Sequence, residues 1–270
     1  FPPQVWLWRS LAAPIGASYD SVLTSFPEED AVYRARGARA HFVGHYLCDR
    51  LPRADAAARA AARASFGLDA GERVVALLPG SRTIEVRELG PILVEAAARL
   101  LVRDPRLRFV LPLAEPRFAA DLAALVARHP FAGRIALVGD SHRALAAADL
   151  ALMASGTASL EATLVGVPMV LLYRLSTVTM GAVGLIRLLG LIDAETVGLP
   201  NLLSGERIVP ELRQGEATAE RLAEEAWQLL EEPQRRAAMR AALDRIRPQL
   251  ARAGTVDGVG DGLGADAAGL

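Results

Sequence analysis

The chain has 270 residues, 52% of them hydrophobic, and a formal net charge of −1 at pH 7. This length is enough for one large or two modest domains with buried cores. The near-neutral charge argues against a general nucleic-acid-binding protein, which normally carries a basic surplus. The single cysteine, Cys48, excludes an internal disulfide and a cysteine-based zinc site, so a reducing, cytosolic setting is the simplest interpretation.

The first part of the chain has the pattern of the end of an α/β domain. Its segments predict a strand, a helix and a strand, at residues 21–26, 27–37 and 40–45. The sequence opens on "FPPQVWLW", which is typical of the interior of a domain, so we expect an amino-terminally truncated fragment. A helical stretch at 53–67 follows, and we place a domain boundary near Leu51.

From Val74 onward, short apolar segments alternate with longer helical ones. The strand candidates are nearly all apolar rather than alternating, as expected when helices cover both faces of a parallel sheet. They lie at residues 73–80, 108–114, 134–140, 149–155 and 168–174. The pattern predicts βαβ units and a doubly wound, Rossmann-like parallel sheet.

The segments after this sheet are helical or irregular. The apolar stretch 177–192 carries Arg187 and several glycines, and it is shorter than the ~20 residues that span a bilayer. It fits either a core segment or one that lies against a membrane surface. Two helices are expected between Thr218 and Leu250, and the Gly/Asp-rich tail should be disordered. The predicted domains are therefore residues 1–50 and 51–250, with a tail at 251–270.

The first strand of the sheet ends in a turn that could bind an anion. In "PGSR", Gly80 allows close backbone approach, the amides of Ser81 and Arg82 can point outward, and the guanidinium matches phosphate oxygens. An ordinary strand-to-helix turn, with Arg82 paired to Glu85 on the surface, explains the same residues. Taken alone, this turn favours the ordinary explanation.

A second turn, "ASGTASLEA", follows the strand at 149–155 and opens a helix. Ser155, Gly156 and Thr157 offer amides and hydroxyls at the positive end of the helix dipole, where anions are stabilised. Glu161 follows one helical turn after Thr157, where its carboxylate could accept hydrogen bonds from a ribose diol. It could equally do no more than complement the dipole.

The two turns together are more informative than either one, because ligands of open α/β sheets bind at the carboxyl ends of the strands. No GxGxxG follows the first strand and no GxxxxGK[ST] occurs, which argues against a dinucleotide oxidoreductase or an ATPase. A nucleotide-sugar site held at two strand ends fits better.

Other polar and aromatic residues carry weaker signals. His45 ends an apolar strand and is better explained as a structural hydrogen-bonding group than as a catalytic base. His41, His129 and His142 are scattered without ligand spacing, so we expect no metal site. Trp6 and Trp8 could line a sugar or acyl groove, although packing on a strand face is the commoner explanation.

Three longer segments resemble the carboxyl-terminal half of lipid-A-disaccharide synthases: "LLPGSRTIEVRELGP", "ASGTASLEATLVGVPMVLLYR" and "LPNLLSGERIVPELRQ". "PQVWLWR" and "FVGHYLCD" are similar to earlier landmarks of that family, in the right order. The resemblance runs from about Phe1 to Leu250. It implies a GT-B glycosyltransferase with two Rossmann-like domains, here a nearly complete carboxyl-terminal one and a remnant of the domain before it.

The resemblance also implies an activity of Gram-negative bacteria. The family transfers 2,3-diacylglucosamine from UDP to 2,3-diacylglucosamine 1-phosphate, making the β-1,6 disaccharide of lipid A with inversion and without a metal or cofactor. Arg82 would contact the leaving phosphate. By the same resemblance the donor site comprises Gly80, Ser81, Arg82, Glu85, Ser155, Gly156, Thr157, Glu161, Asn201, Glu211 and Gln214. A cytoplasmic location, with peripheral contact to the inner membrane, would suit the acylated substrates.

Departures from the family pattern leave alternatives open. The family's general base, an Asp of the amino-terminal domain, is absent from this chain, so the acceptor hydroxyl has no assigned base here. Tyr46 stands where the family usually has Pro, and the tail replaces the usual final helix. A different UDP-GlcNAc-using GT-B enzyme, such as a 2-epimerase, or a UDP-binding module without catalysis would also fit.

Overall fold

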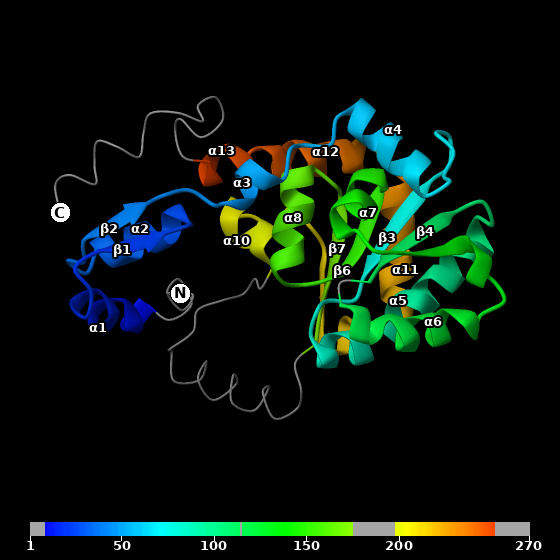
Figure 1. The fold of residues 1–270 in the computed structure, drawn as a ribbon, viewed down its shortest axis with the longest axis horizontal. Coiled ribbons are helices and arrows are strands. Elements are labelled where there is room, and N and C mark those ends of the chain that lie inside the picture. Colours follow the sequence, from blue (N-terminus) through cyan, green and yellow to red (C-terminus); the bar gives the residue numbers. More distant parts are fainter. Residues whose placement is uncertain (1–8, 114, 175–197, 252–270) are drawn as a thin grey trace. The chain divides into compact units, whose positions relative to one another are not determined.

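The computed structural model describes residues 9–113, 115–174 and 198–251. The chain divides into two compact units (Figure 1). The smaller unit contains the residues up to Arg50 together with those from Arg247, and the larger unit is Leu51–Ile246. Each unit has its own sheet.

The larger unit is built on a six-stranded, all-parallel sheet with the order β5-β4-β3-β6-β7-β8. Its strands are β3 (Val74–Leu78), β4 (Arg108–Pro112), β5 (Ile135–Val138), β6 (Leu150–Ala154), β7 (Met169–Tyr173) and β8 (Glu211–Arg213). Every residue of β3 and β6 is buried, as the all-apolar segments predict. The strand order reverses between β3 and β6, which makes their carboxyl ends a topological switch point.

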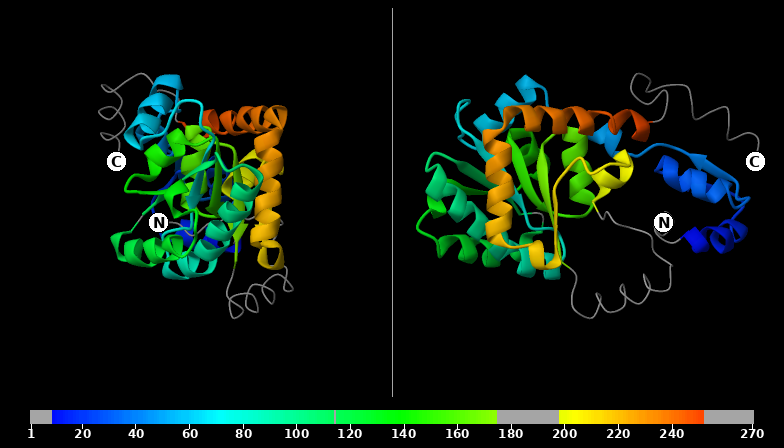
Figure 2. Two further views of the ribbon diagram at one scale, coloured as in Figure 1. Left: turned by 90° about the vertical axis from the view of Figure 1, so that its right-hand side faces the viewer. Right: turned by 180° about the vertical axis from the view of Figure 1, so that it is seen from behind.

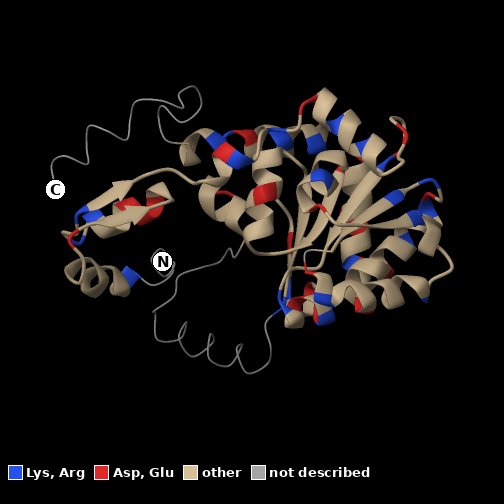
Figure 3. Cartoon of the chain, viewed as in Figure 1, with Lys and Arg blue, Asp and Glu red and all other residues tan. Residues whose placement is uncertain are grey.

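Helices cover both faces of this sheet (Figure 2). They are α4 (Ala56–Ser65), α5 (Thr83–Arg103), α6 (Ala119–Ala127), α7 (Ser141–Ala147), α8 (Thr157–Val165), α10 (Leu199–Ser204), α11 (Ala219–Glu231) and α12 (Pro233–Asp244). Helix α11 packs on α5, whereas α7 packs on α4 and α8. The expected doubly wound parallel sheet is confirmed. Figure 3 shows basic and acidic positions interspersed along these helices, in keeping with the near-neutral charge.

The smaller unit contains a parallel strand pair, β1 (Val22–Thr24) and β2 (Ala40–Phe42), connected by α2 (Pro27–Arg34). Its short helices are α1 (Ala12–Ala17), α3 (Leu47–Arg50) and α13 (Arg247–Leu250). The strand–helix–strand pattern agrees with the sequence expectation for residues 21–45. Its apolar core is formed by Ala12, Val22, Tyr33 and Ala40.

Helix α13 groups with this smaller unit, although the sequence assigned residues up to 250 to the larger domain. Two hydrogen bonds account for the difference. The Arg247 guanidinium donates to the Cys48 carbonyl at 2.7 Å, and the His45 amide donates to the Leu250 carbonyl at 2.8 Å. The functional roles assigned to the two predicted domains remain predictions.

Several sequence expectations lie outside the described residues: those for Trp6, Trp8, the apolar stretch 177–192 and most of the tail. In the part of the chain that the structure describes, no helix is both long and apolar enough to cross a membrane.

Candidate functional site

A cavity of about 200 Å³ lies at the carboxyl ends of β3 and β6, at the switch point of the sheet. It is lined by Leu78, Pro79, Gly80, Ser81, Arg82, Glu85, Pro112, Ser141, Ala154, Ser155, Gly156, Thr157, Ala158 and Glu161. The two turns that the sequence singled out, Gly80–Arg82 and Ser155–Glu161, therefore share one pocket although they lie more than 70 residues apart along the chain. Parallel strands end at the same edge of a sheet, which explains why the turns meet.

The turn after β3 is closed by a carboxylate of its own helix. Glu85 Oε2 accepts hydrogen bonds from the amides of Ser81 and Arg82 at 3.1 and 3.2 Å, and Glu85 Oε1 accepts one from Arg82 Nη1 at 3.1 Å. The two amides do not point freely outward, which corrects the sequence interpretation. They nevertheless bind an anion, since the carboxylate occupies the position that suits a phosphate oxygen.

Gly80 is required in this turn for two reasons. Its φ of +105° is a conformation that residues with a side chain rarely adopt. A Cβ at this position would also lie 2.8 Å from Glu85 Cβ, which is closer than such atoms normally approach. The Arg82 side chain remains 80% exposed despite its contact with Glu85. It can therefore reach an incoming anion without losing a buried contact.

The turn after β6 leads into α8, and it matches the expectation only in part. The Ser155 amide donates to the Leu172 carbonyl at 2.8 Å, so it belongs to the sheet ladder and is not available to a ligand. Gly156 and Thr157 stand at the amino terminus of α8, where backbone N–H groups have no partner within the helix. Both residues line the pocket. An anion in the pocket would meet the positive end of this helix dipole.

Glu161 lies on α8 and lines the same pocket with its side chain 19% exposed. Burial raises the pKa of this carboxyl group above its ordinary value, and the neighbouring His142 opposes the rise. His142 Nε2 lies 3.4 Å from Glu161 Oε2.

His142 was missed as a site residue in the sequence. The available signal was its position, because "GDSHR" follows the strand β5 at the same edge of the sheet as the other two turns. Asp140 caps α7 by accepting a hydrogen bond from the Arg143 amide at 3.0 Å. This cap fixes the first turn of α7, and Ser141 from that turn lines the pocket.

Three residues assigned to the donor pocket by resemblance do not line this cavity. Asn201 and Glu211 are almost completely buried and bind each other, with Asn201 Nδ2 donating to Glu211 Oε1 at 2.7 Å. Asn201 also donates a hydrogen bond to the Val209 carbonyl and accepts one from the Val209 amide. Gln214 follows β8 with a positive φ of 51°. In this structure Asn201 and Glu211 support the loop before β8, and their role in donor binding stays a prediction.

His45 is held by contacts of the smaller unit. Its Nδ1 accepts a hydrogen bond from the Leu47 amide at 3.3 Å, and its ring stacks on Tyr46 at 5.0 Å. Burial lowers the pKa of the imidazole, so the neutral acceptor form is favoured. Burial also raises the pKa of the Cys48 thiol. Within the described ranges, no group of three or more His, Cys, Asp or Glu side chains is placed to hold a metal ion.

Comparison with known proteins gives a family match over most of the chain. The family model described as LpxB, lipid-A-disaccharide synthetase, matches residues 1–255. The chain is 43% identical over 231 residues to the lipid-A-disaccharide synthase of Pseudomonas fluorescens, an alignment that covers 85% of this chain and 59% of that protein. The chain thus spans about three fifths of the length of this relative.

Solved structures with similar folds have low sequence identity and therefore bear on the fold alone. The UDP-GlcNAc 2-epimerase from Neisseria meningitidis aligns with a TM-score of 0.55 at 13% identity, covering 87% of this chain and 62% of that one. WaaG, a glycosyltransferase involved in lipopolysaccharide biosynthesis, aligns with a TM-score of 0.52 at 15% identity, covering 84% and 58%. These neighbours agree with the GT-B type of fold expected from the sequence.

Proposed function

The chain belongs to the lipid-A-disaccharide synthetase family, and we propose that its pocket between the turns after β3 and β6 binds the UDP-sugar donor. The reaction would transfer 2,3-diacylglucosamine to 2,3-diacylglucosamine 1-phosphate, forming the β-1,6-linked lipid A disaccharide 1-phosphate and UDP. The chain spans about three fifths of its relatives, so this activity is proposed for the whole protein to which these residues contribute.

The observation that carries the proposal is the convergence of a guanidinium and a helix amino terminus on one pocket. Arg82 enters from the β3 side, and Gly156 and Thr157 enter from the β6 side. A departing diphosphate gains negative charge as the glycosidic bond breaks. Donors that are already aimed at that charge stabilise the transition state without reorganisation.

Glu161 is positioned to select the sugar of the nucleotide. It follows Thr157 by one helical turn and lines the same pocket. If the diphosphate lies at the amino terminus of α8, the ribose hydroxyls would reach this carboxylate. A carboxylate that is largely removed from water gains more from such hydrogen bonds than an exposed one.

Before the donor binds, the Glu85 carboxylate would occupy the phosphate site. Its carboxylate binds the amides of Ser81 and Arg82, which are among the groups that a diphosphate would use. Donor binding would then require this side chain to swing away. We therefore propose that Glu85 binds these amides only while no donor is bound, and that it does not contact the sugar nucleotide directly.

Both proposed substrates carry acyl chains, so we place the reaction at the cytoplasmic face of the inner membrane. This placement rests on the chemistry of the substrates.

The proposal is tested by titrating the chain with UDP in a calorimeter. We expect saturable binding, and Arg82→Ala should weaken it by ~1.5–3 kcal/mol, the range for hydrogen bonds to charged groups. Arg128→Ala is the matched control, because Arg128 is exposed at the carboxyl-terminal cap of α6 and does not line the pocket. Equal affinity of the parent and the Arg82 variant would place the phosphate elsewhere.

A second arm separates catalysis from binding. The chain is incubated with a radiolabelled UDP-diacylglucosamine donor and the 1-phosphate acceptor. Product that depends on the acceptor identifies the glycosyltransferase, whereas an epimerase would act on its UDP-sugar without any acylated acceptor. Binding of UDP without turnover would identify these residues as a donor-binding module.

A further inference from the structure

The pair formed by His142 and Glu161 connects two helices at the edge of the pocket. His142 lies on α7, after β5, and Glu161 lies on α8, after β6. Their closest atoms, His142 Nε2 and Glu161 Oε2, are 3.4 Å apart. The carboxylate lines the cavity and the imidazole does not. The histidine therefore contacts the acid at the border of the pocket.

We infer that His142 is a positioning residue for Glu161: it holds one carboxylate oxygen and leaves the other for the hydroxyl groups of the bound nucleotide's ribose. The inference rests on the proposed function, because it concerns how a nucleoside diphosphate is held in that pocket. The inference gives the turn after β5, which carries His142, a role in nucleotide binding. The contacts to the diphosphate involve only the turns after β3 and β6.

A half-buried carboxylate is destabilised in its charged form, and a carboxylate that rotates freely offers its oxygens to a diol only part of the time. A ring N–H from His142 fixes the rotation, because one oxygen is already committed. When the imidazole is protonated, it also keeps the neighbouring acid ionised.

The other charged groups near this pair are engaged with different partners. Arg82 and Glu85, which share the pocket, pair with each other. Arg143 on α7 pairs with Asp140 at 3.5 Å.

The elements that pack on α8 bring little further charge to this end of the helix. Neither β6 nor α10 contains a charged residue. On α12, Asp244 pairs with Arg53 at 2.7 Å, beside Gly166 at the far end of α8. The arginines of α12 have other neighbours: Arg235 pairs with Glu225, Arg236 donates to the Leu229 carbonyl, and Arg240 interacts with Asp149. Within the part of the chain that the structure describes, His142 is therefore the basic side chain that pairs with Glu161.

The test compares three variants at position 142 by calorimetric titration with UDP. His142→Ala removes the donor, His142→Gln keeps a donor without charge, and His142→Arg keeps a donor with a permanent charge. At pH 7.5 we expect His142→Ala to weaken UDP binding about three- to tenfold, the effect of one net hydrogen bond, and the Gln and Arg variants to restore most of it.

The pH dependence separates positioning from a merely structural role. Between pH 7.5 and pH 5.5 the Ala and Gln variants should lose more affinity than His142→Arg, because burial raises the pKa of Glu161 and the arginine variant keeps a permanent positive charge beside that carboxyl group. With 2′-deoxy-UDP the differences between the variants should shrink, since one of the hydroxyls that Glu161 accepts from is missing.

The experiment distinguishes a failure of the positioning role from a failure of the proposed function. If the parent binds UDP and His142→Ala binds it equally well at both pH values, the positioning role is refuted while the proposed function stands. If the parent does not bind UDP, the proposed function is refuted and this inference with it. An NMR titration of the Glu161 carboxyl carbon gives an independent check, because its midpoint should rise in His142→Ala and an unchanged midpoint would refute the pairing.

Discussion

Two carboxylates with different partners share the pocket, and their partners decide what each can do. Glu85 binds the backbone of its own turn and the guanidinium of Arg82. Among the described residues, Glu161 forms its ion pair with an imidazole from the neighbouring helix. The first carboxylate occupies an anion site, and the second remains a candidate acceptor for hydroxyl groups. Substitution of the two acids should therefore change UDP affinity in opposite directions.

Glu85→Gln should strengthen UDP binding, by about threefold to tenfold. The change removes a negative charge from a site that must accept a diphosphate, and an amide oxygen competes less well than a carboxylate for the two backbone N–H groups. Calorimetric titration measures the effect, with Glu88→Gln as the control, since Glu88 is on the next turn of α5 and pairs with Arg174 outside the pocket. Weaker binding by Glu85→Gln would mean that Glu85 supports the bound state.

The sequence located the two turns of the pocket but not their internal hydrogen bonds. The carboxyl ends of parallel strands meet at one edge of a sheet, so Arg82 and Thr157 could be brought together on pattern alone. Whether Glu85 turns back onto its own amides depends on side-chain rotamers, which no periodicity encodes. The same holds for Asn201 and Glu211, whose burial depends on the fold of the loop before β8.

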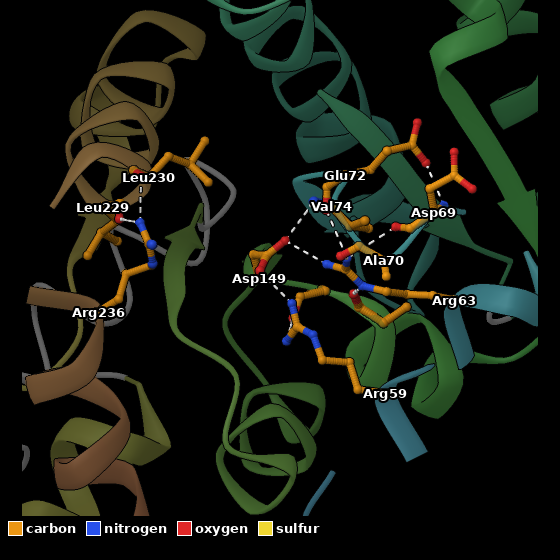
Figure 4. Close-up of polar contacts among 12 residues, drawn as sticks. Arg59, Arg63, Asp69, Ala70, Glu72, Val74, Asp149, Leu229, Leu230 and Arg236 are labelled. Carbon is orange, nitrogen blue, oxygen red and sulfur yellow. Dashed lines mark hydrogen bonds and ion pairs between the residues drawn. The ribbon is translucent and has the colours of Figure 1, made fainter. Parts of the chain in front are cut away.

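At the scale of elements, a buried arginine fastens α4 to the amino ends of β3 and β6 (Figure 4). Arg63 is 5% exposed. It donates to the carbonyls of Ala147, Ala70 and Glu72, and its Nη2 donates to Asp149 Oδ2 at 2.8 Å. Asp149 also accepts from the Val74 amide at 2.8 Å. This network lies at the amino ends of the strands, opposite the pocket. It therefore supports the site indirectly, by holding β3 and β6 in place.

Arg63→Ala should destabilise the larger unit by about 2–4 kcal/mol, because it leaves the carbonyls of Ala147, Ala70 and Glu72 without their buried guanidinium donor, while Asp149 keeps Arg59 and the Val74 amide as partners. Arg59→Ala is the matched comparison: Arg59 binds the same Asp149 but is more exposed, and its loss should cost about 1 kcal/mol. Urea denaturation followed by circular dichroism measures both. Equal midpoints for the two variants would show that burial of Arg63 adds nothing.

The order of strands and helices could be predicted because the apolar segments are continuous where both faces of the sheet are covered. The buried network could not be predicted in this way. In the sequence Arg63 is one of several arginines in an alanine-rich helix, and Asp149 reads only as the residue before a strand. Which arginine turns inward is decided by the packing of α4 on α7.

At the scale of the whole molecule, a buried acid makes the stability of the smaller unit depend on pH. In the smaller unit Glu29 is 5% exposed, and burial, with a further contribution from Glu28, raises its pKa to about 7. The folded form of this unit therefore holds a proton that the unfolded chain releases at lower pH. The stabilisation by this proton is complete below the ordinary pKa of 4.5 and is lost as the pH rises through about 7.

Glu29→Gln should accordingly stabilise the smaller unit at pH 8, by at most about 3 kcal/mol, and should have little effect near pH 4.5. The glutamine stays neutral at every pH, so the loss of stability with rising pH disappears. Hydrogen exchange of the amides of β1 and β2 reports on this unit locally. Asp20→Asn is the control, since Asp20 is exposed. A pH-independent difference between Glu29→Gln and the parent would contradict the assignment.

The larger unit of the structure begins at Leu51. The change of pattern near Leu51 indicates where one sheet ends and the next begins. The membership of α13 in the smaller unit was not predictable, because it depends on contacts of Arg247 and Leu250 with residues about 200 positions earlier.

The account depends most on the location of the nucleotide, and a crystal structure of the chain with bound UDP tests it directly. We predict the diphosphate against the Arg82 guanidinium and the amino terminus of α8, the ribose hydroxyls on Glu161, and Glu85 withdrawn from the amides of Ser81 and Arg82. UDP bound outside this pocket, or bound with Glu85 still holding both amides, would contradict the account.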